Sequence, residues 1–401
     1  MTPNCVSHLP KDLIDMITKR LNLDDLIRFS SVCRSWNFIA SSLIPNPRRN
    51  NPWLIVPLRD HKKTNCLWEK TLGFFSLSNG KTYEVEVLKM DSRRICGIAS
   101  SGWIVTIHEK GEIQLLHPFL KAVVDLPPIT KLPWHKGSHV NKEKKLVYSI
   151  SKPLDRELES DFIRETCIEK VIMSSSESPA TATVMAIQGY LKNLIFCKVG
   201  NDKKWNLVEG DDNNRFDDVT FYQGNFYAVQ AGGHVFVVER LNILSPAVKL
   251  VMNPPYDKMD PQKYYLAGCL GQLLLVIRFL YDHGRFQAGF ERNSYRTTRF
   301  EVFKLDFDAH KWVKVNNLGE DHALFLGTNQ AFTLRTSDVP GCKENCIYFS
   351  DDHLDYVFYN EPTGGYDIGV FDLRYGTTAK CYPCDASFIK PSPVWFTTAS
   401  C

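Results

Sequence analysis

The feature that most constrains the fold is a pair of short extended runs joined by a tight turn, which recurs along most of the chain. In the first pair, residues 74–78 and 81–87 flank Asn79-Gly80, and an Asn-Gly turn between two such runs is a strong hairpin signal. Five more pairs follow, at 113–116 with 122–124, 194–197 with 205–207, 235–238 with 247–250, 300–305 with 312–315, and 369–373 with 377–379. Most of the chain is therefore predicted to be antiparallel sheet.

The spacing of the hairpins indicates a repeated unit. Phe196, Phe236, Phe303 and Phe371 stand at matching positions and are separated by 40, 67 and 68 residues. This suits four-stranded units of about 40 to 50 residues that carry insertions. Because a ring of such sheets protects strand edges that one open sheet would expose, we predict an all-β propeller-like domain over residues 53–401. Six hairpins indicate six blades, and seven remain compatible with the count.

A closed ring also makes a prediction about the two ends of this domain. The terminal run 393–397 should pair beside the early run 53–56, so that the last blade takes a strand from each end. Trp395 should then be buried in the closure.

The first residues have a helical period instead. Leu13, Ile17 and Leu21 recur at intervals of four after Pro10, a residue that suits the first turn of a helix. The segment 9–44 is predicted to form three short helices.

We expect this helical segment to be a separate all-α domain of residues 1–45, followed by a polar, proline-bounded linker at 46–52. A module of fewer than about 40 residues rarely buries all its apolar side chains by itself. Its surplus apolar surface faces either another protein or the large domain, and composition alone leaves both alternatives open.

Charge and hydropathy exclude several classes of protein. The formal net charge is only +3 in 401 residues, so no global field favours nucleic acid. The longest apolar run, residues 269–280, is far shorter than the ~18 residues of a membrane-spanning helix. Twelve scattered cysteines in a chain of this size suit reduced thiols. We expect no nucleic-acid partner, no membrane partner, and a location in the cytoplasm, the nucleus or both.

The order and spacing of the helical segment carry a resemblance. Leu9-Pro10-X-Asp12-Leu13, then Ile17, Leu21 and Leu26, and then Val32-Cys33-Arg34-X-Trp36 resemble the F-box, the module that docks on the Skp-type adaptor of a cullin ubiquitin ligase. The resemblance covers about 36 residues without a gap. It implies adaptor-binding or supporting roles for Leu9, Pro10, Leu13, Ile17, Leu26, Val32, Cys33 and Trp36.

The large domain resembles the KIB-type domain of plant F-box proteins. The motifs that carry this resemblance are Ser101-Gly102-Trp103, Leu115-Leu116-His117-Pro118, Leu126-Pro127-Pro128, Phe221-Tyr222-X-Gly224-X-Phe226-Tyr227-Ala228-Val229, Leu318-Gly319-X-X-X-Ala323-Leu324-Phe325-Leu326-Gly327 and Asn345-Cys346-Ile347-Tyr348-Phe349. His117 replaces the Asn that is usual in that family.

Candidate chemistry is sparse. Cys342-X3-Cys346 and Cys381-X2-Cys384 have spacings that zinc could use, but Pro383 and the strand after Cys346 favour ordinary thiols, so we expect no metal and no cofactor.

The acidic pairs Asp211-Asp212 and Asp217-Asp218 and the cluster Asp351-Asp352-His353 are predicted to lie in solvated turns. Lys142–Lys145 is likewise predicted to be a solvated loop, and the charged stretch 152–170 a surface helix between blades.

These features lead to one leading hypothesis and two alternatives. The chain is predicted to be a non-catalytic substrate-recognition subunit of a cullin-type (SCF) ubiquitin ligase, docking on a Skp-type adaptor, and through it on cullin, while the propeller binds an unknown target protein. One alternative is a propeller that binds proteins outside any ligase. The other is a propeller hydrolase with acids at its central channel, an idea that rests on fold analogy alone.

Overall fold

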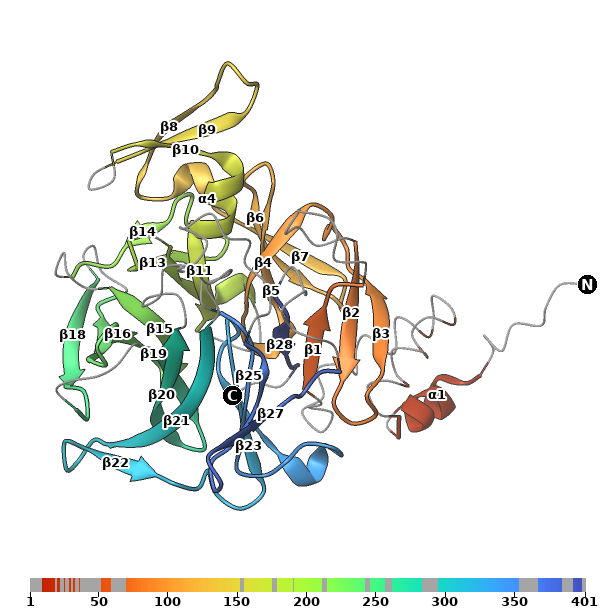
Figure 1. Cartoon of the computed structure of the whole chain (residues 1–401). Coiled ribbons are helices and arrows are strands. Elements are labelled where there is room, and N and C mark those ends of the chain that lie inside the picture. Colours follow the sequence, from red (N-terminus) through yellow and green to blue (C-terminus); the bar gives the residue numbers. More distant parts are fainter. Residues whose placement is uncertain are drawn as a thin grey trace, which may run out of the picture.

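The structure, a computed structural model, is shown in Figure 1. It describes residues 9–18, 20, 21, 25, 29, 32, 36, 52–58, 70–151, 155–174, 179–189, 191–210, 215–241, 246–256, 262–282, 295–352, 367–383 and 392–398.

The described residues beyond position 52 form a propeller-like arrangement of seven sheets. Six of these sheets have four or five strands, and one has three. In chain order, the first three sheets are β28-β1-β2-β3 (Val394–Phe396, Trp53–Val56, Thr71–Ser76, Thr82–Glu86), β4-β5-β6-β7 (Arg93–Ile98, Ile104–His108, Ile113–His117, Ala122–Leu126) and the small sheet β10-β9-β8 (Glu157–Glu159, Leu146–Ile150, His135–Val140).

The other four sheets follow along the chain. They are β11-β12-β13-β14 (Ile168–Met173, Thr183–Gln188, Asn193–Lys198, Asn206–Leu207), β15-β16-β17-β18 (Phe216–Tyr222, Asn225–Gln230, Val235–Glu239, Ala247–Met252), β19-β20-β21-β22 (Gln262–Cys269, Gln272–Asp282, Tyr295–Asp306, Lys311–Val315) and β24-β23-β25-β26-β27 (Phe332–Arg335, His322–Leu326, Cys346–Phe349, Gly369–Asp372, Thr377–Ala379). Short 3₁₀ turns cover Ser100–Gly102, Ile129–Lys131, Pro179–Thr181 and Thr336–Asp338.

All six predicted hairpins are confirmed. They are β2 with β3, β6 with β7, β13 with β14, β17 with β18, β21 with β22, and β26 with β27. One boundary is wrong: Trp205 was placed in a strand, but β14 begins at Asn206. Trp205 instead lies in the core between two sheets, where its Nε1–H donates to Pro127 O at 2.7 Å.

The predicted closure of the two ends is also confirmed. β28 pairs with β1 in antiparallel fashion, and Trp395 lies opposite Leu54. Trp395 is fully buried and makes edge contacts with the rings of Phe325 and Tyr348 in the last sheet. The last residues of the chain therefore join the first sheet and pack on the final one.

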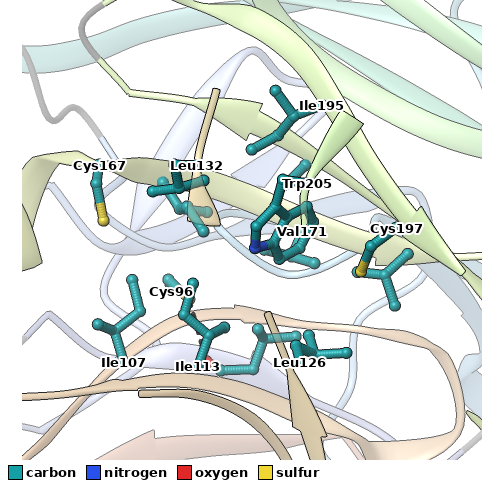
Figure 2. Close-up of a cluster of buried hydrophobic side chains, with 14 of the residues drawn as sticks. Cys96, Ile107, Ile113, Leu126, Leu132, Cys167, Val171, Ile195, Cys197 and Trp205 are labelled. Carbon is teal, nitrogen blue, oxygen red and sulfur yellow. Dashed lines mark hydrogen bonds between the residues drawn. The ribbon is translucent and has the colours of Figure 1, made fainter. Parts of the chain in front are cut away.

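Six clusters of buried apolar side chains join the six larger sheets in a cycle. Five of them lie between sheets that follow one another in the chain, and the sixth joins the last sheet to the first. Figure 2 shows one cluster, in which Val171 and Ile195 of β11 and β13 lie above Ile107 and Ile113 of β5 and β6. Burial of apolar area stabilises a fold by about 25 cal/mol per Å². Because every junction between sheets buries such area, the cycle is the main source of stability.

The innermost strands lie side by side in the order β28, β4, β11, β15, β19 and β24. The segment that connects β23 to β24 reaches across to two of them. The Gln330 N–H donates to Ile98 O of β4 at 2.8 Å, and Lys170 Nζ of β11 lies 3.4 Å from Gly327 O. This segment therefore ties together strands that are far apart in sequence.

The last sheet differs from the four-stranded antiparallel unit that the hairpins predicted. It has five strands, and its β23 and β25 run parallel. Parallel neighbours need a long crossover connection, which β24 and the turn Thr336–Asp338 supply here.

The prediction of a surface helix over residues 152–170 is wrong. In its described part, Glu157–Glu159 forms β10, helix α4 covers only Ser160–Thr166, and β11 begins at Ile168. Leu158 alternates with two glutamates, which is a strand period, and it lies opposite Tyr148 of β9. Ile163 of α4 is buried rather than exposed.

At the amino terminus, the first predicted helix is confirmed as α1, Lys11–Thr18. The N–H groups of Leu13 and Ile14 donate to Pro10 O at 3.0 and 3.1 Å, which starts its first turn. The other two predicted helices and the linker lie mostly outside the described residues and stay predictions. Neither described α-helix has the length and apolar content that a membrane crossing requires.

Candidate functional site

Helix α1 presents an apolar face to solvent. Leu13, Met16 and Ile17 are 42%, 55% and 40% exposed, and residues three and four apart share one side of a helix. Val32 is 58% exposed as well. Exposed apolar side chains gathered in this way are typical of a surface that another protein covers.

The opposite side of the same segment is buried. Ile14 is 3% exposed and Phe29 is 7% exposed, and both belong to the cluster that holds Trp53 and Phe74 of the first sheet. The ring of Phe29 stacks on the ring of Trp36, with 4.0 Å between the ring centroids. Figure 1 shows α1 beside β3, at the outer side of that sheet. The alternative in which the segment packs on the large domain is therefore confirmed for its buried side, whereas a protein partner for the exposed side stays a prediction.

The predicted adaptor-binding residues fall into three groups. Pro10, Leu13, Ile17 and Val32 are exposed, whereas Leu9 and Trp36 are half-buried. Leu26 and Cys33 lie outside the described residues. The roles of all eight residues at an interface stay predictions.

Sequence reasoning missed Met16 as a member of the exposed face. The signal was available, because Met16 lies three residues after Leu13.

The propeller-like domain buries a network of charges near its innermost strands. Arg278 of β20 is 1% exposed, and its guanidinium donates to Tyr265 Oη at 2.9 Å, to Asp352 Oδ1 at 3.1 Å and to Asp367 Oδ2 at 2.9 Å. It also lies 4.8 Å from the centre of the Phe349 ring. A buried cation with two carboxylates and a cation–π contact is fully compensated.

The network extends to neighbouring sheets through lysines. Lys263 Nζ lies 3.1 Å from Asp352 Oδ2, and Lys170 Nζ lies 2.5 Å from Asp218 Oδ1. Burial alone would raise the pKa of Asp352, but Lys263 and Arg278 lower it below its usual value. Burial raises the pKa of Asp218, and Lys170 opposes that shift.

Two predictions about acidic residues are therefore wrong. Asp218, Asp351 and Asp352 were expected in solvated turns, but they are 0%, 5% and 4% exposed. The counter-charges of Asp218 and Asp352 come from other sheets, so local sequence could not reveal them. Asp217, 9% exposed, lies 3.5 Å from Lys192 Nζ. Asp211, Asp212 and His353 lie outside the described residues.

These carboxylates are arranged as structural ion pairs. A general acid or base must exchange protons with a substrate, whereas Asp352 and Asp367 accept hydrogen bonds from Arg278 in the interior. The part of the chain that the structure describes thus provides no positive evidence for catalysis.

Of the four cysteines in the candidate zinc spacings, the three that are described, Cys342, Cys346 and Cys381, are free thiols. Burial raises the pKa of Cys342 to about 12 and that of Cys381 to about 12, which disfavours the thiolate that binds metal. Cys384 lies outside the described residues. Among those that are described, no three His, Cys, Asp or Glu side chains come together as a metal site would require.

His117 has a structural role. Its Nδ1 accepts from the Leu120 N–H at 3.1 Å, which leaves Nε2 to donate to Ser101 O at 3.1 Å. Burial lowers the pKa of His117 to about 4. An Asn side chain also carries one acceptor and a donor group, so it could make the same two hydrogen bonds.

Comparison with known families identifies both parts of the chain. The F-box domain model matches residues 6–48. The KIB1-4 beta-propeller model matches residues 74–372, more than half of the chain. The chain belongs to the KIB1-4 beta-propeller family of F-box proteins.

The relatives are F-box proteins of Arabidopsis thaliana. F-box protein SKIP23 is 26% identical over 98% of this chain and 95% of its own length. F-box protein At2g17036 is 26% identical over 98% of this chain and 94% of its own length. F-box protein At2g26160 is 25% identical over 86% of this chain and 95% of its own length. F-box proteins with propellers are in general substrate-recognition subunits of SCF ligases, and they are typically non-catalytic.

Proposed function

We propose that this chain is a substrate-recognition subunit of an SCF-type ubiquitin ligase, docking through its helical segment on a Skp-type adaptor and through that adaptor on cullin. The observation that carries the proposal is the exposed apolar face of α1, Leu13, Met16 and Ile17. Burial of such a face against a partner is favourable at about 25 cal/mol per Å² of apolar area.

The predicted contacts divide between interface and support in this proposal. Pro10, Leu13, Met16, Ile17 and Val32 contact the adaptor because they are exposed, and half-buried Leu9 joins them beside Pro10. Trp36 supports the segment from within, because its ring stacks on Phe29.

The propeller holds the target protein. We infer six blades, one for each of the larger sheets joined by the cycle of apolar clusters. Ubiquitin transfer itself belongs to other subunits. The contribution of this chain is proximity, since a bound target has a high effective concentration near the conjugating enzyme.

A location in the cytoplasm or nucleus fits this role and is part of the proposal. The described cysteines are all free thiols, as expected for a protein kept in a reducing compartment.

Co-purification of the full chain with a Skp-type adaptor tests the proposal. Wild-type chain should retain the adaptor, and Leu9→Ala with Pro10→Ala should lose it, because a few anchors carry most of an interface's binding energy. The matched control is Leu207→Ala with Leu250→Ala, two residues 45% and 47% exposed on outer strands of the sheets, which should bind normally. Adaptor binding by the first double variant at wild-type yield would show that these two residues are not anchors. No binding by wild-type chain would favour a propeller that acts outside a ligase.

A further inference from the structure

The small sheet β10-β9-β8 stands outside the cycle of larger sheets and ends in a hairpin arm, at the top of Figure 1. Its base is firmly held. Tyr148 and Ile150 of β9 are buried in the cluster that also contains Ile163 of α4 and the cores of two larger sheets. The arm is therefore a fixed projection rather than a loose loop.

Strand β8 is the open edge of this arm. The Asn141 N–H donates to Lys145 O at 2.9 Å, so these two residues form a hydrogen-bonded pair. Hydrogen-bonded and non-hydrogen-bonded pairs alternate along an antiparallel ladder. Val140, opposite Leu146, and Ser138, opposite Tyr148, are therefore non-hydrogen-bonded positions. Their N–H and C=O groups point away from β9, toward solvent.

The side chains along this edge are accessible too. Ser138 and Val140 are both exposed, and Val140 is 63% exposed. An exposed β-branched residue on an open edge is the pattern by which a sheet accepts another strand.

The arm is strongly basic for its length. Residues 135–150 contain four lysines and one glutamate, although the whole chain has a net charge of only +3. Lys136 and Lys145 pair with Asp155 at 2.7 Å and Glu159 at 2.8 Å. Lys142 and Lys144 are exposed in the turn, and neither forms an ion pair with the described residues.

On two other outer strands, a lysine is paired with a glutamate of the neighbouring strand. Lys249 of β18 pairs with Glu239 at 3.3 Å, and Lys314 of β22 pairs with Glu301 at 3.2 Å. The β8 edge combines outward-pointing backbone groups with two lysines, Lys142 and Lys144, that form no ion pair with the described residues.

We propose that the β8 edge is a docking site for an extended acidic segment of a polypeptide, which adds to the small sheet as a further strand. The backbone of the segment pairs with Ser138 and Val140, and its carboxylates lie near Lys142 and Lys144. Backbone pairing of this kind requires a peptide, because nucleic acid has no alternating N–H and C=O groups. The turn also lacks the aromatic side chains on which bases would stack.

This inference deepens the proposed function by naming the chemistry of a target segment. Its test uses the purified full chain without adaptor, so the result is independent of whether the adaptor binds.

The probe is a fluorescent eight-residue peptide that alternates glutamate and valine, measured by anisotropy at low and high salt. The wild-type chain should bind it, with affinity falling as salt rises because the charges are exposed. A peptide that alternates lysine and valine, and an oligothymidine of similar length, should bind at least tenfold more weakly.

Ser138→Pro isolates the contribution of the backbone. Proline removes the outward N–H and is tolerated on an edge strand, so the affinity for the glutamate peptide should fall roughly three- to tenfold, the range expected for one hydrogen bond. Ser138→Ala keeps the N–H and should bind like wild type.

Lys142→Gln with Lys144→Gln isolates the charge. This variant should weaken binding and flatten its salt dependence. The control, Lys203→Gln with Lys204→Gln, removes two exposed lysines from another turn. It should change neither the affinity for the glutamate peptide nor its salt dependence. Circular dichroism checks that each variant is folded.

Three results would overturn the proposal. The first is equal binding of the acidic and basic peptides. The second is wild-type affinity in a folded Ser138→Pro chain. The third is tighter binding of oligothymidine than of the glutamate peptide, which would assign the arm to nucleic acid instead.

Discussion

The helical segment and the sheets treat apolar side chains in opposite ways. Three of the eight residues of α1 are apolar and at least 40% exposed, whereas all four residues of β1 are at most 1% exposed. Each larger sheet buries apolar side chains against both of its neighbours in the cycle. Helix α1 packs on an apolar cluster on one side only. The difference predicts that the sheets are stable by themselves and that a partner covers the helix.

Charges follow the same division. The sheets bury Arg278 with Asp352 and Asp367, while in α1 the charged residue Asp12 is exposed. Removing one partner from a buried pair costs far more than breaking an exposed pair. The comparison can therefore be tested by deletions and substitutions on each side.

The largest effect should come from removing β28. A chain that ends at Lys390 loses the strand that pairs with β1 and exposes Phe325 and Tyr348, against which Trp395 packs. Loss of the Trp395 side chain alone costs about 3–5 kcal/mol, so we expect an aggregated or largely unfolded product. Circular dichroism and size-exclusion chromatography measure this. A monomeric truncated chain with wild-type melting temperature would mean that the closure contributes little.

The next effect should come from the buried charge network. Arg278→Met leaves Asp352 and Asp367 without their guanidinium, which should lower the free energy of unfolding by about 3–5 kcal/mol at pH 7.5. Burial by itself raises the pKa of Asp352, and Arg278 opposes that effect, so in the variant the loss should shrink as the pH falls and Asp352 becomes neutral. Urea denaturation at pH 7.5 and 5.5 measures both effects. The control, Lys314→Met, removes a lysine whose side chain is 48% exposed from its pair with Glu301 and should cost less than about 1 kcal/mol. Equal losses in the two variants would refute the distinction.

A smaller and pH-dependent effect should come from His117. Burial lowers its pKa to about 4 in the folded chain, below the ordinary value near 6.5. The unfolded chain therefore binds a proton first as the pH falls, and stability should decrease between about pH 6.5 and 4, by at most about 3 kcal/mol. His117→Asn should remove this component from the pH dependence of unfolding. His310→Asn, a change at an exposed turn residue, should leave the profile unchanged.

The smallest effect on stability should come from the exposed face of α1. Leu13→Ala with Ile17→Ala should change the unfolding free energy by no more than about 0.5 kcal/mol per site, because exposed side chains lose little on truncation. Ile14→Ala, on the buried side of the same helix, should lower the protection of α1 against hydrogen exchange. Hydrogen exchange of α1 distinguishes the two variants, and equal protection in both would mean that the helix has no distinct inner side.

Short-range features of the fold were predictable from sequence. The hairpin at Asn79-Gly80 depends on a turn that these residues prefer, and Gly80 adopts a φ of 67° there. Likewise, the four-residue spacing of Leu13 and Ile17 placed both on one side of α1. The exposed site was thus partly predictable, although Met16 was overlooked.

Long-range features were not predictable in the same way. Asp218 stands in an ordinary polar stretch of sequence, and its partner Lys170 is on another sheet. The charged segment around Leu158 was assigned a helix because its charges alternate, yet β9 was available as a strand partner. In both cases a residue distant in sequence decided the outcome.

The sequence by itself determined that this chain is a helical segment followed by hairpins, because turn chemistry and apolar periodicity act between near neighbours. Only the tertiary structure decided which side of α1 is covered, how the last sheet gained a fifth strand, and which aspartates are buried. Those outcomes depend on contacts between sheets, where desolvation and counter-charges come from residues far apart in the chain.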